Sequence, residues 1–160
     1  MQLAGKDTDA PVSDHARALR DALRRLLVAH GALDEACRPC GAPLTTSHAW
    51  ALLELRDAGS ITVSALAERL NIDRTNVSRL CARMESDGEV ARVVHPQDRR
   101  ARLVKLTDKG ERLAATVDRS STDHFALVLG RLDADVAGAI ELLGALTWAM
   151  GSTSTQENCA

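Results

Sequence analysis

The chain has 160 residues, enough for one domain of ordinary size or for a small domain with an added oligomerisation part. It carries 20 Lys and Arg against 22 Asp and Glu, and the net charge of −2 excludes a uniformly basic, histone-like protein. Hydrophobic residues make up 45% of the chain, which argues against wholesale disorder. Because aromatic residues make up only 2%, we expect a helical core of Leu and Ala rather than an all-β core.

The sequence also bears on the compartment. No apolar run approaches the roughly 20 residues that a membrane-spanning helix needs. The polar stretch at residues 1–11 does not resemble a signal peptide. We therefore expect a cytoplasmic protein without a membrane partner, whose four cysteines stay reduced unless they bind a metal or sense oxidants.

Helix signals recur through the first half of the chain. A flexible arm comes first, and a helix follows in which leucines repeat every three or four residues. Proline and glycine then interrupt the chain before three shorter helices, each preceded by a Ser, Thr or Asp that can cap it. The predicted segments are an arm at 1–12, a helix at 13–36, a helix from 45–47 through 55, an extended piece at 61–62, and helices at 63–70 and 74–86.

The pattern changes in the second half. Two runs of alternating residues flank a polar turn and predict a β-hairpin with a long loop. Two longer helices follow, each opened by residues that favour a helix start. The predicted segments are strands at 89–94 and 101–106, helices at 107–130 and from 133–135 to about 150, and a flexible tail at 151–160.

This order of elements predicts a mainly α fold with a small β-hairpin wing. In residues 44–106, two short helices joined by a tight turn precede the hairpin, as in a winged helix-turn-helix DNA-binding domain. The helices at 13–36 and 107–150 have apolar faces wider than a single chain can cover. We therefore expect these outer helices to form an intertwined, symmetric dimer.

The helix at 74–86 has two different sides. Its buried stripe is predicted to consist of Val77, Leu80, Cys81 and Met84, which follow the i, i+3, i+4, i+7 spacing. Its other surface carries side chains suited to base edges and phosphates. These candidate DNA contacts are Arg74, Thr75, Asn76, Ser78, Arg79 and Arg83.

Basic charge is concentrated in the hairpin. Residues 92–105 hold five basic residues against one acidic residue, and residues 60–112 hold eleven against eight. Arg99, Arg100 and Arg102 are the candidate contacts here. Each phosphate that such a side chain neutralises contributes about −0.9 to the salt slope of binding. The alternative is that the hairpin is an ordinary solvated surface.

Several motifs resemble the MarR family of bacterial regulators. They are Leu52-Leu53-Glu54-Leu55, the run 61–70, Asp73-Arg74-Thr75-Asn76-Val77-Ser78-Arg79-Leu80, Asp98-Arg99-Arg100 and Leu106-Thr107-Asp108-Lys109-Gly110. The resemblance covers about residues 13–150. It implies an obligate homodimer that binds a palindromic double-stranded DNA operator and is released by a small ligand, metal or oxidant.

The resemblance also implies roles for particular residues. The recognition side chains would be Arg74, Thr75, Asn76, Ser78 and Arg79. Arg100 would reach the minor groove from the wing, and Asp98 would hold it in place. We interpret the chain as a repressor rather than an enzyme, with no cofactor required for DNA binding.

Cys37 and Cys40 form a C-x-x-C pair followed by glycine, a spacing that lets two thiolates hold one thiophilic metal or metalloid ion. His48 is a further candidate ligand, although a lone histidine there is more often a helix cap or surface residue. The pair could instead be a thiol redox sensor or two incidental loop cysteines. A thiol oxidoreductase is a weaker alternative, because no βαβ pattern surrounds the motif.

Three other side chains have alternative interpretations. Cys81 is expected in the core because it lies on the buried stripe. Trp50 and Phe125 could line a ligand pocket, which would make the chain an aromatic-ligand-responsive MarR-type repressor, although core packing is the commoner role for each.

Overall fold

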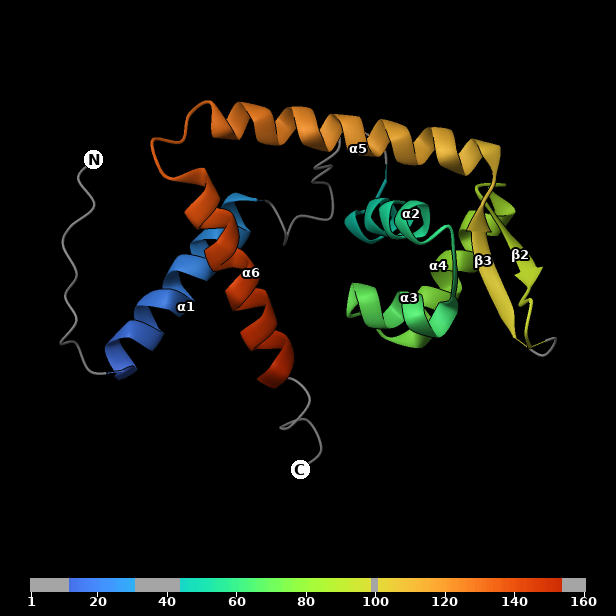
Figure 1. Cartoon of the computed structure of the whole chain (residues 1–160), viewed down its shortest axis with the longest axis horizontal. Coiled ribbons are helices and arrows are strands. Elements are labelled where there is room, and N and C mark those ends of the chain that lie inside the picture. The colour runs from blue at the N-terminus through green and yellow to red at the C-terminus, as the bar shows by residue number, and fades with distance from the viewer. Residues whose placement is uncertain (1–11, 31–43, 99–100, 154–160) are drawn as a thin grey trace. The chain divides into compact units, whose positions relative to one another are not determined.

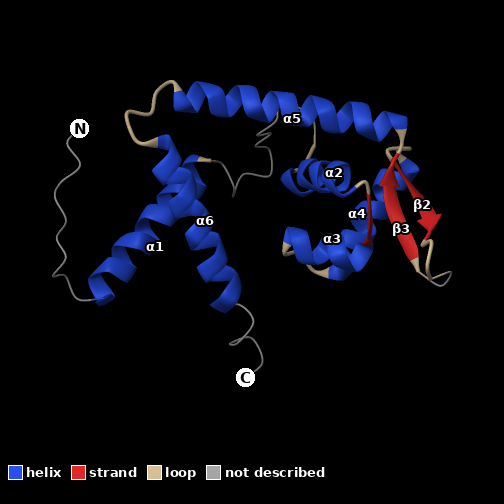
Figure 2. Cartoon of the chain, in the orientation of Figure 1, coloured by secondary structure: helices blue, strands red, loops and turns tan. Residues whose placement is uncertain are grey.

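The structure is a computed structural model that describes residues 12–30, 44–98 and 101–153 (Figure 1). It divides into two compact units, residues 1–121 and 122–160. Helices dominate the described residues, and three strands form one small sheet (Figure 2). The mainly α fold with a small β wing is therefore confirmed.

The described elements follow the predicted order. They are α1 Val12–Ala29, α2 Thr46–Ala58, β1 Ser60–Thr62, α3 Val63–Leu70, α4 Arg74–Ser86, β2 Val90–Val94, β3 Arg102–Leu106, α5 Asp108–Leu129 and α6 Val136–Thr153. The helix predicted to reach residue 36 ends at Ala29, and its remainder from 31 lies outside the described residues. The last helix continues to Thr153, past the predicted start of the tail at residue 151.

Side-chain caps explain where the helices of the first unit begin. The hydroxyl of Thr62 accepts a hydrogen bond of 3.1 Å from the backbone N–H of Ala65 at the start of α3. Asp73 caps α4 by accepting from the backbone N–H groups of Thr75 at 2.8 Å and Asn76 at 3.2 Å. Asn71 ends α3 in the left-handed region, with φ of 50°. These local signals are why α3 starts and stops, and why α4 starts, at the predicted residues.

The sheet has one more strand than the predicted hairpin. Its order is β1-β3-β2, with every neighbouring pair antiparallel. The extended piece predicted at 61–62 becomes β1, in which Ile61 lies opposite Val104 of β3. Both of these residues are buried, so the third strand anchors the wing to the core.

The described residues of the first unit form one hydrophobic core. It brings together α2, α3, α4, the sheet and the first half of α5 (Figure 1). Its fully buried large side chains are Leu52, Leu55, Leu66, Val77, Cys81, Met84, Val104 and Val117. Cys81 is 1% exposed, as expected for a core residue, and its burial raises the pKa of its thiol.

The remaining helices are different in character. Large apolar side chains stay exposed on α1, on the second half of α5 and on α6. They include Leu19, Leu26, Leu27, Val28, Phe125, Leu127, Val128, Leu129, Ile140, Leu142, Leu143, Trp148 and Met150. Among the described residues, no helix combines the length and hydrophobicity needed to cross a membrane.

Candidate nucleic-acid interface

Helix α4 presents a polar face on a buried apolar base. Val77, Cys81 and Met84 are buried on its inner side, and Leu80 is partly buried beside them. The predicted stripe is therefore confirmed. The outer side exposes Arg74, Thr75, Asn76, Arg79 and Arg83, while Ser78 is half-buried.

The cations at the start of this helix are available to a ligand. Among the described residues, no salt bridge engages Arg74 or Arg79, whereas Arg83 lies 3.9 Å from Asp87. Hydrogen bonds from the backbone N–H groups of Asn76 and Thr75 lower the pKa of Asp73, and the nearby charge of Arg79 adds a smaller effect. Asp73 consequently stays ionised at neutral pH and keeps the first turn of α4 in place.

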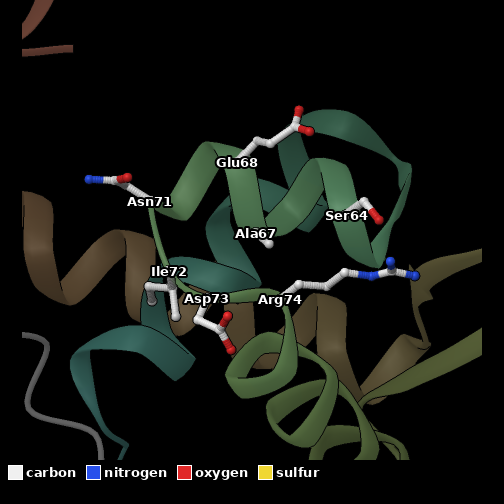
Figure 3. Close-up of a pocket in the computed structure, with 7 residues that line it drawn as sticks. All are labelled: Ser64, Ala67, Glu68, Asn71, Ile72, Asp73 and Arg74. Atoms are coloured by element: carbon white, nitrogen blue, oxygen red, sulfur yellow. The ribbon is translucent and has the colours of Figure 1, made fainter. Parts of the chain in front are cut away.

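A shallow hollow separates α3 from the start of α4 (Figure 3). Ala67 and Ile72 contribute its apolar part, and Ser64, Glu68, Asn71, Asp73 and Arg74 contribute its polar part. In Figure 3 the side chains of Ser64 and Arg74 point to the same side of this hollow, whereas those of Glu68 and Asn71 point away from it. The hydroxyl of Ser64 is therefore a candidate contact that the sequence interpretation missed.

The wing is formed by β2 and β3. Arg102 of β3 is exposed, and Arg92 of β2 is tied back to α4 by an ion pair of 3.1 Å with Glu85. The ring Nδ1 of His95 accepts hydrogen bonds of 3.2 Å from the backbone N–H groups of Gln97 and Asp98. This arrangement shapes the turn that leads to the wing tip. Arg99 and Arg100 lie outside the described residues, so the contact expected between Asp98 and Arg100 stays a prediction.

The run Leu106-Thr107-Asp108-Lys109-Gly110 joins the wing to α5. The hydroxyl of Thr107 accepts from the N–H of Gly110 at 3.2 Å and donates to the carbonyl of Gly88 at 2.7 Å. The Lys109 ammonium donates to the carbonyl of Asp87. A Cβ at position 110 would overlap the carbonyl oxygen of Glu89, so only glycine fits there. The motif therefore fastens the start of α5 to the segment between α4 and β2.

His48 is not at the surface and does not cap α2. The cap is Thr45, whose hydroxyl accepts from the N–H of His48 at 3.3 Å. His48 is 5% exposed, and its Nε2 lies 2.6 Å from Oε2 of Glu89, which is also 5% exposed. Helical spacing already places His48 on the same buried face as Leu52 and Leu55, a signal that predicts burial. Nothing in the sequence pairs it with Glu89.

The predicted metal site is not described. Cys37 and Cys40 lie outside the described residues, as does Cys159. Within the described ranges, no three His, Cys, Asp or Glu side chains are grouped closely enough to hold a metal ion. The ligand role suggested for His48 stays a prediction, and its observed partner is a carboxylate.

Trp50 and Phe125 are not packed in the core, so the commoner role expected for them is wrong. Their exposed fractions are 50% and 52%. The ring of Phe125 stands edge-on to that of His124, with centroids 5.5 Å apart. Because the two residues belong to different units, a shared ligand pocket stays a prediction.

The comparison with known proteins agrees with this geometry. Residues 42–101, which span α2 to the wing tip, match the model of the MarR family. The resemblance to the MarR family is therefore confirmed over these residues. The matched residues contain the polar face of α4 and strand β2 of the wing, whereas strand β3 follows them.

Sequence relatives carry related names. The transcriptional activatory protein BadR of Rhodopseudomonas palustris is 41% identical over 69 residues, which is 41% of this chain and 39% of BadR. The chain therefore matches well under two thirds of the length of that relative.

Solved structures extend the likeness to most of the chain. RV1404 from Mycobacterium tuberculosis is 27% identical, with a TM-score of 0.64 over 92% of this chain and 97% of that one. A mutant of MarR from E. coli, complexed with operator DNA, gives a TM-score of 0.67 at 23% identity, over 86% of this chain and 99% of that one. At 23% identity, this similarity to the operator complex concerns the fold alone.

Proposed function

We propose that this protein is a MarR-family transcriptional regulator, a repressor that binds a palindromic DNA operator as a homodimer. The observation that carries the proposal is α4, with its apolar side buried and its cationic and amide side chains exposed beside a wing. Arg reads guanine and Asn reads adenine in the major groove, while hydroxyls reach bases or phosphates. A DNA-binding role also agrees with a cytoplasmic location.

A homodimer is supported by the exposed apolar residues of α1, α5 and α6. Helix α6 has one charged residue, Glu141, in its 18 positions, and large apolar side chains such as Ile140 and Leu143 are more than half exposed. A second copy of the chain is the partner that would cover such a surface symmetrically. Two recognition helices would then meet half-sites about one helical turn apart, roughly 34–36 Å.

The contacts would divide between two elements. Arg74, Thr75, Asn76, Ser78 and Arg79 would enter the major groove, with Arg83 further along the same helix. Arg99, Arg100 and Arg102 would follow the backbone, with Arg100 entering the minor groove and Asp98 supporting it. Ser64 would add a phosphate contact beside Arg74.

The test is fluorescence anisotropy with a DNA duplex that the wild-type protein selects from a random pool. Arg79→Ala should weaken binding about tenfold or more, because a bidentate base contact accounts for about 1–3 kcal/mol. Arg100→Ala should weaken it severalfold and make the salt dependence shallower. Arg119→Ala, an exposed arginine of α5, is the matched control and should bind as wild type. Unchanged affinity in both test variants would contradict the proposal.

The effector is proposed from the sequence. A thiophilic metal or metalloid ion at Cys37 and Cys40 would release the operator, and the C-x-x-C spacing is the observation that supports it. Native mass spectrometry of the reduced dimer with Zn²⁺, Cd²⁺, Cu⁺ and arsenite, run beside operator release, tests this. Replacing both cysteines by Ser should abolish the response and preserve DNA binding, whereas Cys159→Ser should change neither.

The alternatives give different results in the same experiment. If the pair is a thiol redox sensor, peroxide or diamide rather than an ion releases the DNA from the wild type only. If an aromatic acid is the effector, substitution of Trp50 or Phe125 changes the response and the cysteine variant does not. BadR is named as an activatory protein, so transcription in vitro from a bound promoter distinguishes repression from activation.

A further inference from the structure

Glu89 lies at a junction of four elements. Its backbone N–H donates to the carbonyl of Met84 in α4 at 2.9 Å, and its carbonyl accepts from the N–H of Thr107, next to α5, also at 2.9 Å. Its carboxylate meets the ring of His48 in α2. The next residue, Val90, begins β2. One buried residue thus links α2, α4 and α5 at the point where the wing leaves the core.

The bond between His48 and Glu89 is the unusual part of this junction. Both side chains are buried, and burial of a carboxylate is unfavourable unless it is paired. The 2.6 Å contact between Nε2 of His48 and Oε2 of Glu89 is a directional hydrogen bond, in which Nε2–H donates when the carboxylate is ionised. Two apolar side chains would fill the same space, but their contact would not fix the orientation of either side chain. The polar pair instead fixes both the distance and the orientation of Glu89.

The position of Glu89 matters because the wing extends from it. Strand β2 has five residues, of which all but the first are exposed, at about 3.3 Å per residue. A rotation of about 5° at Glu89 therefore moves the far end of β2 by more than about 1 Å. Arg102 pairs with Val94 at that end, so the displacement falls on the basic part of the wing.

We propose that His48 and Glu89 form a positioning pair that sets the wing relative to the recognition helix α4 and ties that setting to α2. His48 does not contact DNA and acts through Glu89. The proposal rests on the proposed DNA-binding function for its consequence. Its structural part, a wing whose orientation this buried bond helps to set, does not depend on DNA.

The test separates positioning from stability. In His48→Leu/Glu89→Leu the polar bond is replaced by apolar packing, so the melting temperature should stay within a few degrees of wild type or rise. Affinity for the selected duplex should nevertheless fall at least about fivefold at constant salt. The salt slope should become shallower by about 1.8, since each of two wings loses about one phosphate contact.

Two further variants give the result its specificity. His48→Gln keeps an N–H donor toward Glu89 and should restore the affinity and the salt slope. Arg56→Gln/Asp118→Asn replaces a different bond from α2, a 2.9 Å contact to α5, and should leave the salt slope unchanged. A double-leucine protein with wild-type affinity and slope would overturn the proposal, as would a His48→Gln protein that behaves like the double-leucine one.

Hydrogen exchange distinguishes failure of this inference from failure of the proposed function. Amides of β2 and β3 should exchange about tenfold faster in the double-leucine protein, while the amides of α4 stay protected. If the wild type binds no DNA at any salt and the wing amides still respond, the function is wrong and the positioning pair stands. Unchanged wing exchange overturns the pair.

Discussion

The two regions of the molecule differ in how far they bury their apolar side chains. From α2 to the first half of α5, the apolar side chains close into one core, and polar caps and short hydrogen bonds complete it. On α1, the second half of α5 and α6, large apolar side chains remain exposed. The first region buries its apolar side chains within one chain, whereas the second leaves an apolar surface that the proposed second copy would cover.

This difference assigns different tasks to the two regions. A self-sufficient core can hold the recognition helix and the wing rigidly, which base readout requires. Helices with exposed apolar faces can hold two such units at a defined spacing when a second copy covers them. Substitutions should therefore affect folding in the first region and assembly in the second.

The largest effect is expected from breaking assembly. Ile140→Glu/Leu143→Glu places charge on the exposed apolar surface of α6 and should convert the dimer to a folded monomer in light scattering. Operator affinity should fall by about 10²–10⁴, because the second half-site no longer binds intramolecularly. Ile140→Leu/Leu143→Ile preserves volume and should stay dimeric. A charged variant that remains a dimer would show that α6 is not the interface.

Two glycines compare the regions directly. Gly110→Ala forces a Cβ against the carbonyl of Glu89 and should lower the free energy of unfolding by about 3 kcal/mol in urea. Gly144→Ala meets no atom within 4 Å and should raise it by about 0.5–1 kcal/mol at the same protomer concentration. Equal changes in the free energy of unfolding would contradict the difference between the two regions. A lower free energy of unfolding for Gly144→Ala would indicate that the Gly144 side of α6 packs against the partner copy.

Two threonines repeat the comparison at smaller scale. Thr62→Ala removes the cap of α3 and should lower the free energy of unfolding by about 1 kcal/mol. Thr147 in α6 only bonds back to the carbonyl of Leu143, so Thr147→Ala should change it by less than about 0.5 kcal/mol. Thermal or urea unfolding measures both. A larger loss at Thr147 would indicate that its hydroxyl has an intermolecular role.

The smallest effect concerns Cys81. A protein in which Cys37, Cys40 and Cys159 are replaced by Ser keeps this thiol alone, and burial raises its pKa. At pH 7 to 8 it should be almost entirely protonated and should react with a disulfide reagent only as fast as the protein opens. Absorbance of the released thiolate measures the rate. Immediate stoichiometric reaction of the folded protein would show that the core is open at α4.

Much of the first region could be predicted from local signals. The bounds of α3 and α4 follow from Thr62, Asn71 and Asp73, which act on neighbouring backbone groups. The buried stripe of α4 follows from helical spacing alone. His48 also lies at a buried spacing, but a lone polar side chain gives no indication of its partner.

The sequence by itself determined the order of the elements, the two-sided character of α4 and the resemblance to the MarR family, because each depends on residues close together in the chain. Only the tertiary structure decided the third strand, the bond between His48 and Glu89, and the need for glycine at position 110. Each of these features depends on residues that are more than 20 positions apart in the chain. Such contacts depend on how the elements pack, and local propensity does not encode that packing.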